Sequence, residues 1–315
     1  MINKIIYKLK KKTIQLYVSI RNEFDDETIK ELNRKQKVKI YLKKCICHPI
    51  ALLKAILKKE FNIKYIEIVL TTKCTLNCKG CSALMNYYKK RYDTNINQNI
   101  EAIKKVLNSC DSIYHLRLLG GEPLLYPKLY ELLEFLNKQN KIKRITIVTN
   151  GTLLIKNEKI IKILKNNLFN VFISNYGINS SKKEELINQL KENNIRYILG
   201  KEDTLWRNYG DLKNRNRKEK ELKKQFLNCK IMCTSILDGK LHHCPRSSHG
   251  TNIKKISLRK QDYIDLLDNN IDEKQLRKEL YKFFYKYIPY IEACNYCNSA
   301  TKDLKSMPAG EQYKK

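Results

Sequence analysis

Three cysteines placed directly after a predicted strand constrain this chain more than any other feature. Residues 65–70 form a β-branched run, and Cys74, Cys78 and Cys81 follow it in the order CxxxCxxC. One short loop can therefore direct three thiolates to one point. Three soft ligands leave a metal site one ligand short, as a catalytic centre requires, whereas structural zinc normally closes with a fourth ligand. The spacing predicts a metal centre at a strand end, with structural zinc as the alternative.

Strand and helix patterns alternate from residue 64 to the region of residue 200. The predicted strands cover residues 65–70, 113–119, 145–149, 171–174 and 195–199. The first intervening helix places Ile96, Ile100 and Ile103 on one face. Asp93 and Thr94 are its candidate N-caps. This alternation predicts an α/β fold with a parallel sheet, either an open doubly wound sheet or a full or partial barrel, with its chemistry at the C-terminal strand ends.

Polar and glycine-rich segments follow the second, third and fourth predicted strands. Their residues are Gly120, Gly121, Glu122 and Pro123 after the second strand, Thr149, Asn150 and Gly151 after the third, and Ser174 and Asn175 after the fourth. Each segment alone is typical of an ordinary turn. Together they fall on the face where a parallel barrel binds its ligands, and glycine lets backbone carbonyls approach a ligand closely. We therefore predict a cofactor site along these strand ends.

The CxxxCxxC loop, together with the GGEP segment at Gly120–Pro123, resembles the radical S-adenosylmethionine (SAM) superfamily. The resemblance implies a partial (β/α)6 TIM-like barrel whose [4Fe-4S] cluster, held by the three cysteines, binds SAM at its open iron. It also implies SAM contacts at the polar residues of the strand ends. In such enzymes the reduced cluster cleaves SAM to a 5'-deoxyadenosyl radical, which abstracts a substrate hydrogen. One departure is Gly80, where many relatives carry an aromatic residue before the third cysteine.

A second cysteine group lies in the C-terminal third of the chain. It comprises Cys229, Cys233, Cys244, Cys294 and Cys297. The group resembles a twitch/SPASM-like auxiliary cluster region, with a hairpin turned at Asp238 and Gly239. The resemblance implies a second [4Fe-4S] cluster, and full ligation by four cysteines favours electron transfer. One of Cys229 and Cys233 is then spare, and a zinc ribbon remains the alternative. Hydrogen bonding or exposure explains His242 and His243 better than ligation does.

The first part of the chain, residues 1–62, is predicted to be a basic helical extension. Apolar residues at helical spacing give it an amphipathic face; they are Ile2, Ile5, Ile6, Leu9, Leu16, Ile20 and Phe24. Such a helix packs on its own domain or, as the alternative, makes peripheral membrane contact through residues 1–30. Cys45, Cys47 and His48 form a weaker metal-site candidate. Residues 63–205 are the predicted radical SAM core, and residues 206–315 are the predicted small α+β cluster-binding domain.

The composition limits the cellular location and the binding partners that we expect for this chain. The sequence has no run of roughly 18 apolar residues and no signal peptide pattern, so we expect a cytoplasmic protein. Clustered cysteines in such a protein indicate metal binding rather than disulfides. The net charge of +31 is spread along the whole chain, which favours a general compositional bias over a nucleic-acid or acidic-partner site. No DNA partner is expected.

The predicted function is an oxidoreductase-like radical SAM reaction on a peptide or protein. Modification of a sugar or nucleotide-linked carbohydrate intermediate is the alternative, and the positive charge would suit it. An electron donor such as flavodoxin or ferredoxin is the expected partner. A second alternative, from another class of function, is a non-catalytic zinc-binding, nucleic-acid-binding scaffold. Such a scaffold would hold zinc at both cysteine groups and bind nucleic acid in a salt-dependent way.

Overall fold

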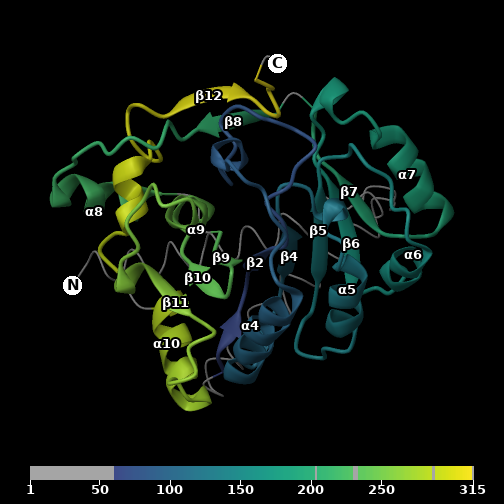
Figure 1. The fold of residues 1–315 in the computed structure, drawn as a ribbon, viewed down its shortest axis with the longest axis horizontal. Helices are drawn as coiled ribbons and strands as arrows, with labels where there is room; N and C mark the ends of the chain where they lie inside the picture. Colours follow the sequence, from purple (N-terminus) through teal and green to yellow (C-terminus); the bar gives the residue numbers. More distant parts are fainter. Residues whose placement is uncertain (1–59, 203, 230–232, 286–287, 314–315) are drawn as a thin grey trace, which may run out of the picture.

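The computed structural model describes residues 60–202, 204–229, 233–285 and 288–313 (Figure 1). The predicted amphipathic helix and the candidate ligands Cys45, Cys47 and His48 lie outside the described residues. The predictions made for them, including membrane contact, stay predictions.

The main element is an eight-stranded sheet in the order β11-β10-β9-β2-β4-β5-β6-β7. Its strands are β2 (Ile66–Val69), β4 (Leu116–Leu119), β5 (Ile145–Thr149), β6 (Phe169–Ile173), β7 (Tyr197–Leu199), β9 (Ser235–Leu237), β10 (Lys240–His242) and β11 (Tyr263–Asp265). The six strands from β9 to β7 run parallel, while β10 and β11 are antiparallel to their neighbours. The predicted α/β fold with a parallel sheet is confirmed.

Helices connect the successive parallel strands. They are α4 (Ile96–Ser109), α5 (Leu129–Asn137), α6 (Glu158–Leu164) and α7 (Lys183–Glu192). Their apolar faces pack on the sheet, so that Leu132 and Leu133 are fully buried with Leu118 and Ile147 of the strands. This packing leaves the C-terminal strand ends as the place where loops from different units meet (Figure 1).

The rest of the chain adds smaller elements around the sheet. They are β1 (Asn62–Ile63), β3 (Ser112–Ile113), β8 (Leu205–Asn208), α8 (Glu219–Asn228), α9 (Pro245–Asn252), α10 (Glu273–Tyr285), β12 (Lys305–Pro308) and the 3-10 turns η1 (Met85–Tyr87), η2 (Pro123–Leu125), η3 (Gly177–Asn179), η4 (Lys260–Asp262) and η5 (Glu292–Tyr296). Strand β9 pairs with β2, so the sheet continues across the predicted boundary at residues 205/206. Strands β8 and β12 pair with each other and lie across the top of the view in Figure 1.

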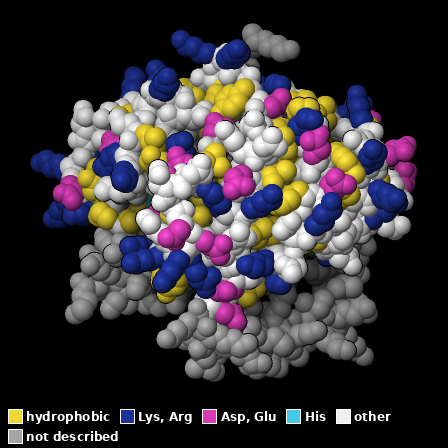
Figure 2. Space-filling view, turned by 60° about the horizontal axis from the view of Figure 1, so that its bottom comes forward, with side chains coloured by type: hydrophobic (Ala, Val, Ile, Leu, Met, Phe, Trp, Pro, Cys, Tyr) yellow, Lys and Arg dark blue, Asp and Glu magenta, His cyan; other side chains and the backbone are white. Residues whose placement is uncertain are grey.

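The surface mixes charges of both signs. On the face shown in Figure 2, Lys and Arg side chains are scattered among Asp and Glu side chains and do not form one basic patch. Across the described residues, no helix is both long enough and apolar enough to cross a bilayer.

Candidate functional site

The first cysteine loop is held against the GGEP segment by backbone hydrogen bonds. The loop leaves β2 at Leu70, and the amide of Gly121 donates to the carbonyl of Thr71 at 2.8 Å. The amide of Glu122 donates to the carbonyl of Lys73 at 2.8 Å. These two bonds extend the pairing of β2 and β4 beyond the sheet. The cysteines are thereby fixed at the C-terminal end of the parallel strands.

The three thiols of this loop lie together at one cavity. Burial raises the pKa of Cys74 to about 11 and that of Cys78 to about 12, and the neighbouring thiols add to both shifts. Burial also raises the pKa of Cys81, although hydrogen bonds from three backbone amides lower it in part. Buried thiols of this kind become thiolates when a metal supplies positive charge. The donor set and its spacing fit a three-cysteine cluster site.

Five of the nine predicted SAM-contacting residues line the same cavity. They are Gly120, Gly121, Thr149, Asn150 and Ser174. Asn150 links this group to the cysteine loop, because its side-chain amide donates to the Sγ of Cys74 at 3.7 Å and to the hydroxyl of Thr75 at 3.0 Å. The ends of β4, β5 and β6 therefore converge on the cysteine loop.

The other four predicted residues are not among those that line the cavity. Glu122 is fully buried and accepts hydrogen bonds from the amides of Asn150 at 2.8 Å and Leu124 at 3.1 Å. Pro123 begins η2, and Gly151 has a φ of 73° in the turn after β5. Asn175 bonds Glu202 and the amide of Gly177. They shape the loops that present the lining residues.

Glu122 gives a pH-dependent prediction. Burial raises its pKa to about 7, against the two amides that favour the charged form. A carboxyl whose pKa is raised by folding stabilises the fold below its unfolded value near 4.5, and this contribution is lost as the pH rises through the folded value. We expect the melting temperature of the wild type to fall more between pH 5 and pH 8 than that of Glu122→Gln. Equal falls in parallel anaerobic melts would show that Glu122 is already ionised at pH 5.

Four of the five C-terminal cysteines form a second group. Cys229 ends α8, Cys244 caps the N-terminus of α9, and Cys294 and Cys297 lie in and after η5. The four thiols interact electrostatically with one another, and burial raises the pKa of Cys244 to about 12 and that of Cys294 well above its usual value. The hydroxyl of Ser299 is 3.2 Å from the Sγ of Cys229. Three separate elements thus bring four soft ligands together.

A network of side-chain donors holds the chain around this second group. Arg217 donates to the carbonyls of Cys294 at 3.1 Å and Cys297 at 2.6 Å, and Gln225 donates to the latter at 2.8 Å. Arg246 donates to the carbonyl of Tyr296 at 2.7 Å. Among the described residues, no three metal-ligating side chains converge on the position of a single ion. The all-thiol donor set is what indicates the metal, because soft thiolates select iron–sulfur clusters or zinc.

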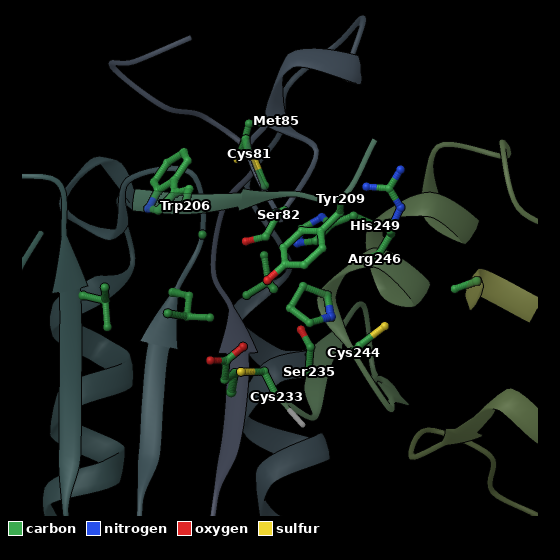
Figure 3. Close-up of a pocket in the computed structure, with 18 of the residues that line it drawn as sticks. Cys81, Ser82, Met85, Trp206, Tyr209, Cys233, Ser235, Cys244, Arg246 and His249 are labelled. Atoms are coloured by element: carbon green, nitrogen blue, oxygen red, sulfur yellow. The ribbon is translucent and has the colours of Figure 1, made fainter. Parts of the chain in front are cut away.

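Cys233 faces the central strands, and its thiol also interacts electrostatically with Cys244 of the group of four. Burial raises its pKa, and the carboxylate of Glu67 adds to the shift while Arg117 opposes it. Glu67 and Arg117 come from β2 and β4, and Arg117 donates to the hydroxyl of Tyr65 at 2.9 Å. In Figure 3, Cys233 lies beside the central strands and Cys244 lies on the side of α9. The structure places Cys233 against the side chains of Glu67 and Arg117 on the central strands β2 and β4.

The histidines near Cys244 take part in packing. His242 stacks on Tyr263, and its Nδ1 is 3.1 Å from the hydroxyl of Ser247. His243 stacks on Phe283, with ring centroids 3.7 Å apart. Burial lowers the pKa of His242 to about 3, so its ring is neutral. Both rings are thus engaged in stacking, and His242 also takes part in a hydrogen bond.

Both cysteine groups line one cavity of about 490 Å³ (Figure 3). Trp206, Tyr209 and Met85 also line it, and the sequence analysis did not single them out. Glu67 and Arg117 line it as well, and a charge inside an apolar strand was the sequence signal that could have indicated them. The two cysteine groups therefore face one shared space.

The family comparison fits this geometry. Residues 68–196 match the family model of the radical SAM superfamily. This part of the chain is a radical SAM domain. Domains of this family belong to enzymes that use a [4Fe-4S] cluster and SAM, and CxxxCxxC supplies fitting ligands for the cluster. The predicted recognition and cofactors are confirmed for this domain, whereas the second cluster stays a prediction.

Curated relatives match part of the chain. A GTP 3',8-cyclase from Aquifex aeolicus (strain VF5) is 31% identical over 130 residues, which are 40% of this chain and 39% of that protein. A GTP 3',8-cyclase from Clostridium perfringens (strain 13 / Type A) is 34% identical over 119 residues, 36% of this chain and 34% of that protein. The match thus spans well under half of either relative. Among solved structures, BtrN in complex with AdoMet and 2-DOIA has a TM-score of 0.46 at 16% identity, covering 80% of this chain and 97% of that one.

Proposed function

We propose that this radical SAM domain works with the C-terminal region as one enzyme that abstracts a hydrogen atom from a peptide or protein substrate. The observation that carries this proposal is the single cavity shared by Cys74, Cys78, Cys81 and the second cysteine group. With cluster and SAM bound, one electron breaks the C5'–S bond, methionine leaves, and the 5'-deoxyadenosyl radical takes a hydrogen from the substrate. The electron comes from a donor such as flavodoxin or ferredoxin.

The chain's own residues bind and orient the reactants in this proposal. Gly120 and Gly121 offer backbone carbonyls close to the cluster loop, where a SAM ammonium group can donate to them. Asn150 and Ser174 present polar groups from the next two strand ends. Trp206, from β8, closes the cavity on the side of the cysteine loop and helps to keep water out (Figure 3).

The second cluster is proposed to lie on Cys229, Cys244, Cys294 and Cys297. Four thiols leave its iron atoms fully ligated, which suits electron transfer rather than direct substrate binding. A cluster held there would supply an electron acceptor facing the shared cavity, so that the substrate, after giving up a hydrogen atom, would lose one electron to the cluster and one proton to solvent. The overall reaction on the substrate is accordingly an oxidation.

The cavity lining supports a peptide side chain over a phosphorylated ligand. Of the described lining residues, the two arginines already bind protein groups: Arg117 bonds Tyr65 and pairs with Glu67, and Arg246 donates to three backbone carbonyls. His249 is neutral, because burial lowers its pKa to about 3. Binding of several phosphate charges would require cations that are not already engaged.

A nucleotide-linked carbohydrate is the second candidate substrate. It is favoured by the names of the curated relatives, which are GTP 3',8-cyclases. The net charge of +31 would also attract a phosphorylated substrate.

Deuterium transfer separates the two candidates. The reconstituted enzyme is given SAM and dithionite with either a peptide digest from cells grown in deuterated medium or GTP deuterated on the ribose. We expect deuterium in the released 5'-deoxyadenosine with the peptides, and none with Cys81→Ala as the control. Transfer from GTP alone would favour the second candidate, and transfer from neither would contradict both.

A further inference from the structure

A segment far from the cysteine loop in sequence lies directly on it. Residues 305–313, here called the strap, begin with β12, which pairs with β8 from Lys305 opposite Asn208 to Pro308 opposite Leu205. The strap then runs along the loop that carries Cys78, and Cys78 and Gln312 form an antiparallel bridge. Figure 1 shows β12 passing over the ends of the central strands.

Backbone and charged contacts fix the strap to the loop. The amide of Lys79 donates to the carbonyl of Glu311 at 2.6 Å, and the amide of Tyr313 donates to the carbonyl of Asn77 at 3.0 Å. The side chains of Lys79 and Glu311 form an ion pair at 2.6 Å. The pairing is therefore strand-like and has a defined register.

Within this register the side chain of Gln312 reaches a cluster ligand. Its Nε2 donates to the Sγ of Cys78 at 3.1 Å and to the carbonyl of Gly310 at 2.5 Å. Its Oε1 accepts from the amide of Asn77 at 2.7 Å. Both ends of the amide are engaged, so its orientation toward the sulfur is set.

The packing of the strap explains why glycine stands at position 80, where many radical SAM relatives carry an aromatic residue. Gly80 has a φ of 63°, and a Cβ there would lie 2.3 Å from the Sδ of Met307. Met307 of the strap thus fills the space beside the third cysteine, next to the wall formed by Trp206 and Tyr176. A larger residue at position 80 would have to displace the Met307 side chain and adopt a left-handed backbone conformation that glycine favours.

We infer that Gln312 is a positioning residue for the first cluster, and that its amide stabilises the cluster's reduced state through the N–H···S bond to Cys78. A donor to a ligand sulfur favours the form with more negative charge, and hydrogen bonds to the sulfurs are among the determinants of cluster potential. This inference rests on the proposed cluster at Cys74, Cys78 and Cys81.

Three variants test this inference. Gln312→Met removes the donor with little change in size, and Gln312→Glu keeps the acceptor for Asn77 while replacing the donor by a negative charge. Glu311→Gln is the matched control, because it breaks the ion pair with Lys79 and leaves the amide of Gln312 in place. Iron content is measured first. The reduction potential of the cluster whose EPR signal changes on SAM addition is then measured by anaerobic titration.

We expect all variants to bind iron. At a fixed ambient potential, the ratio of reduced to oxidised first cluster should fall about threefold to tenfold in Gln312→Met, the range expected for one hydrogen bond. It should fall further in Gln312→Glu and stay unchanged in Glu311→Gln. Equal ratios in all four proteins, or an equal fall in the control, would overturn the inference alone. A wild type without a SAM-responsive cluster would overturn it together with the proposed function.

Discussion

Gly121→Ala is expected to prevent stable binding of the first cluster. A Cβ at this position would lie 2.2 Å from the carbonyl oxygen of Lys73 and 2.7 Å from the Cβ of Cys74. Neither neighbour is a flexible side-chain end, so the cysteine loop must move away from β4. We expect a loss of about 1–3 kcal/mol in stability from this overpacking. Iron analysis after anaerobic reconstitution should show roughly four iron atoms fewer than in the wild type.

Gly200→Ala is the matched control for this prediction. Gly200 follows β7, and a Cβ there would lie 3.2 Å from the carbonyl of Ile173, a contact that small shifts can relieve. The control should keep the iron content and the SAM-cleaving activity of the wild type. Full iron loading of Gly121→Ala would contradict the close packing of the GGEP segment on the loop.

Alanine at Cys229 is expected to remove the second cluster, whereas alanine at Cys233 is expected to leave it in place. Cys229 interacts with the other three thiols of the group, whereas Cys233 interacts more strongly with Glu67 of β2 and Arg117 of β4 than with Cys244. In reconstituted protein, Cys229→Ala should lose roughly four iron atoms and Cys233→Ala none.

Cys244→Ala serves as the positive control for this comparison, because Cys244 interacts with the other three thiols of the group. Its iron content should match that of Cys229→Ala. Loss of iron in Cys233→Ala with full iron in Cys229→Ala would reverse the assignment. Zinc in place of iron at this site would favour the zinc ribbon.

The fold was predictable wherever its signals are local. The third strand was predicted at residues 145–149, and β5 has those bounds, because a β-branched run between two helical patterns has few other interpretations. The cap of α4 was predicted less well. Asn95 caps it, accepting from the amides of Asn97 and Gln98, whereas Thr94 uses its hydroxyl for the carbonyl of Leu70 at 2.8 Å. That choice depends on a strand neighbour that the local sequence does not show.

The site divides in the same way. The CxxxCxxC and GGEP motifs each span only a few residues and directly follow a predicted strand. The sequence alone therefore predicts that they lie at the strand ends. The pairing of β9 with β2 and the contact of Gln312 with Cys78 join segments far apart in sequence. No periodicity or spacing encodes such contacts, because they arise only when the whole sheet is assembled. Cys229 and Cys233 could not be told apart for the same reason.

The most direct test compares the wild type with Cys74→Ala/Cys78→Ala/Cys81→Ala after anaerobic reconstitution with iron and sulfide. Iron content, EPR and 5'-deoxyadenosine release under dithionite are measured on both proteins. We predict roughly eight iron atoms in the wild type and about four in the triple variant, with complete loss of SAM cleavage in the latter. Bound zinc without iron or SAM cleavage in the wild type would contradict the account and favour the non-catalytic scaffold.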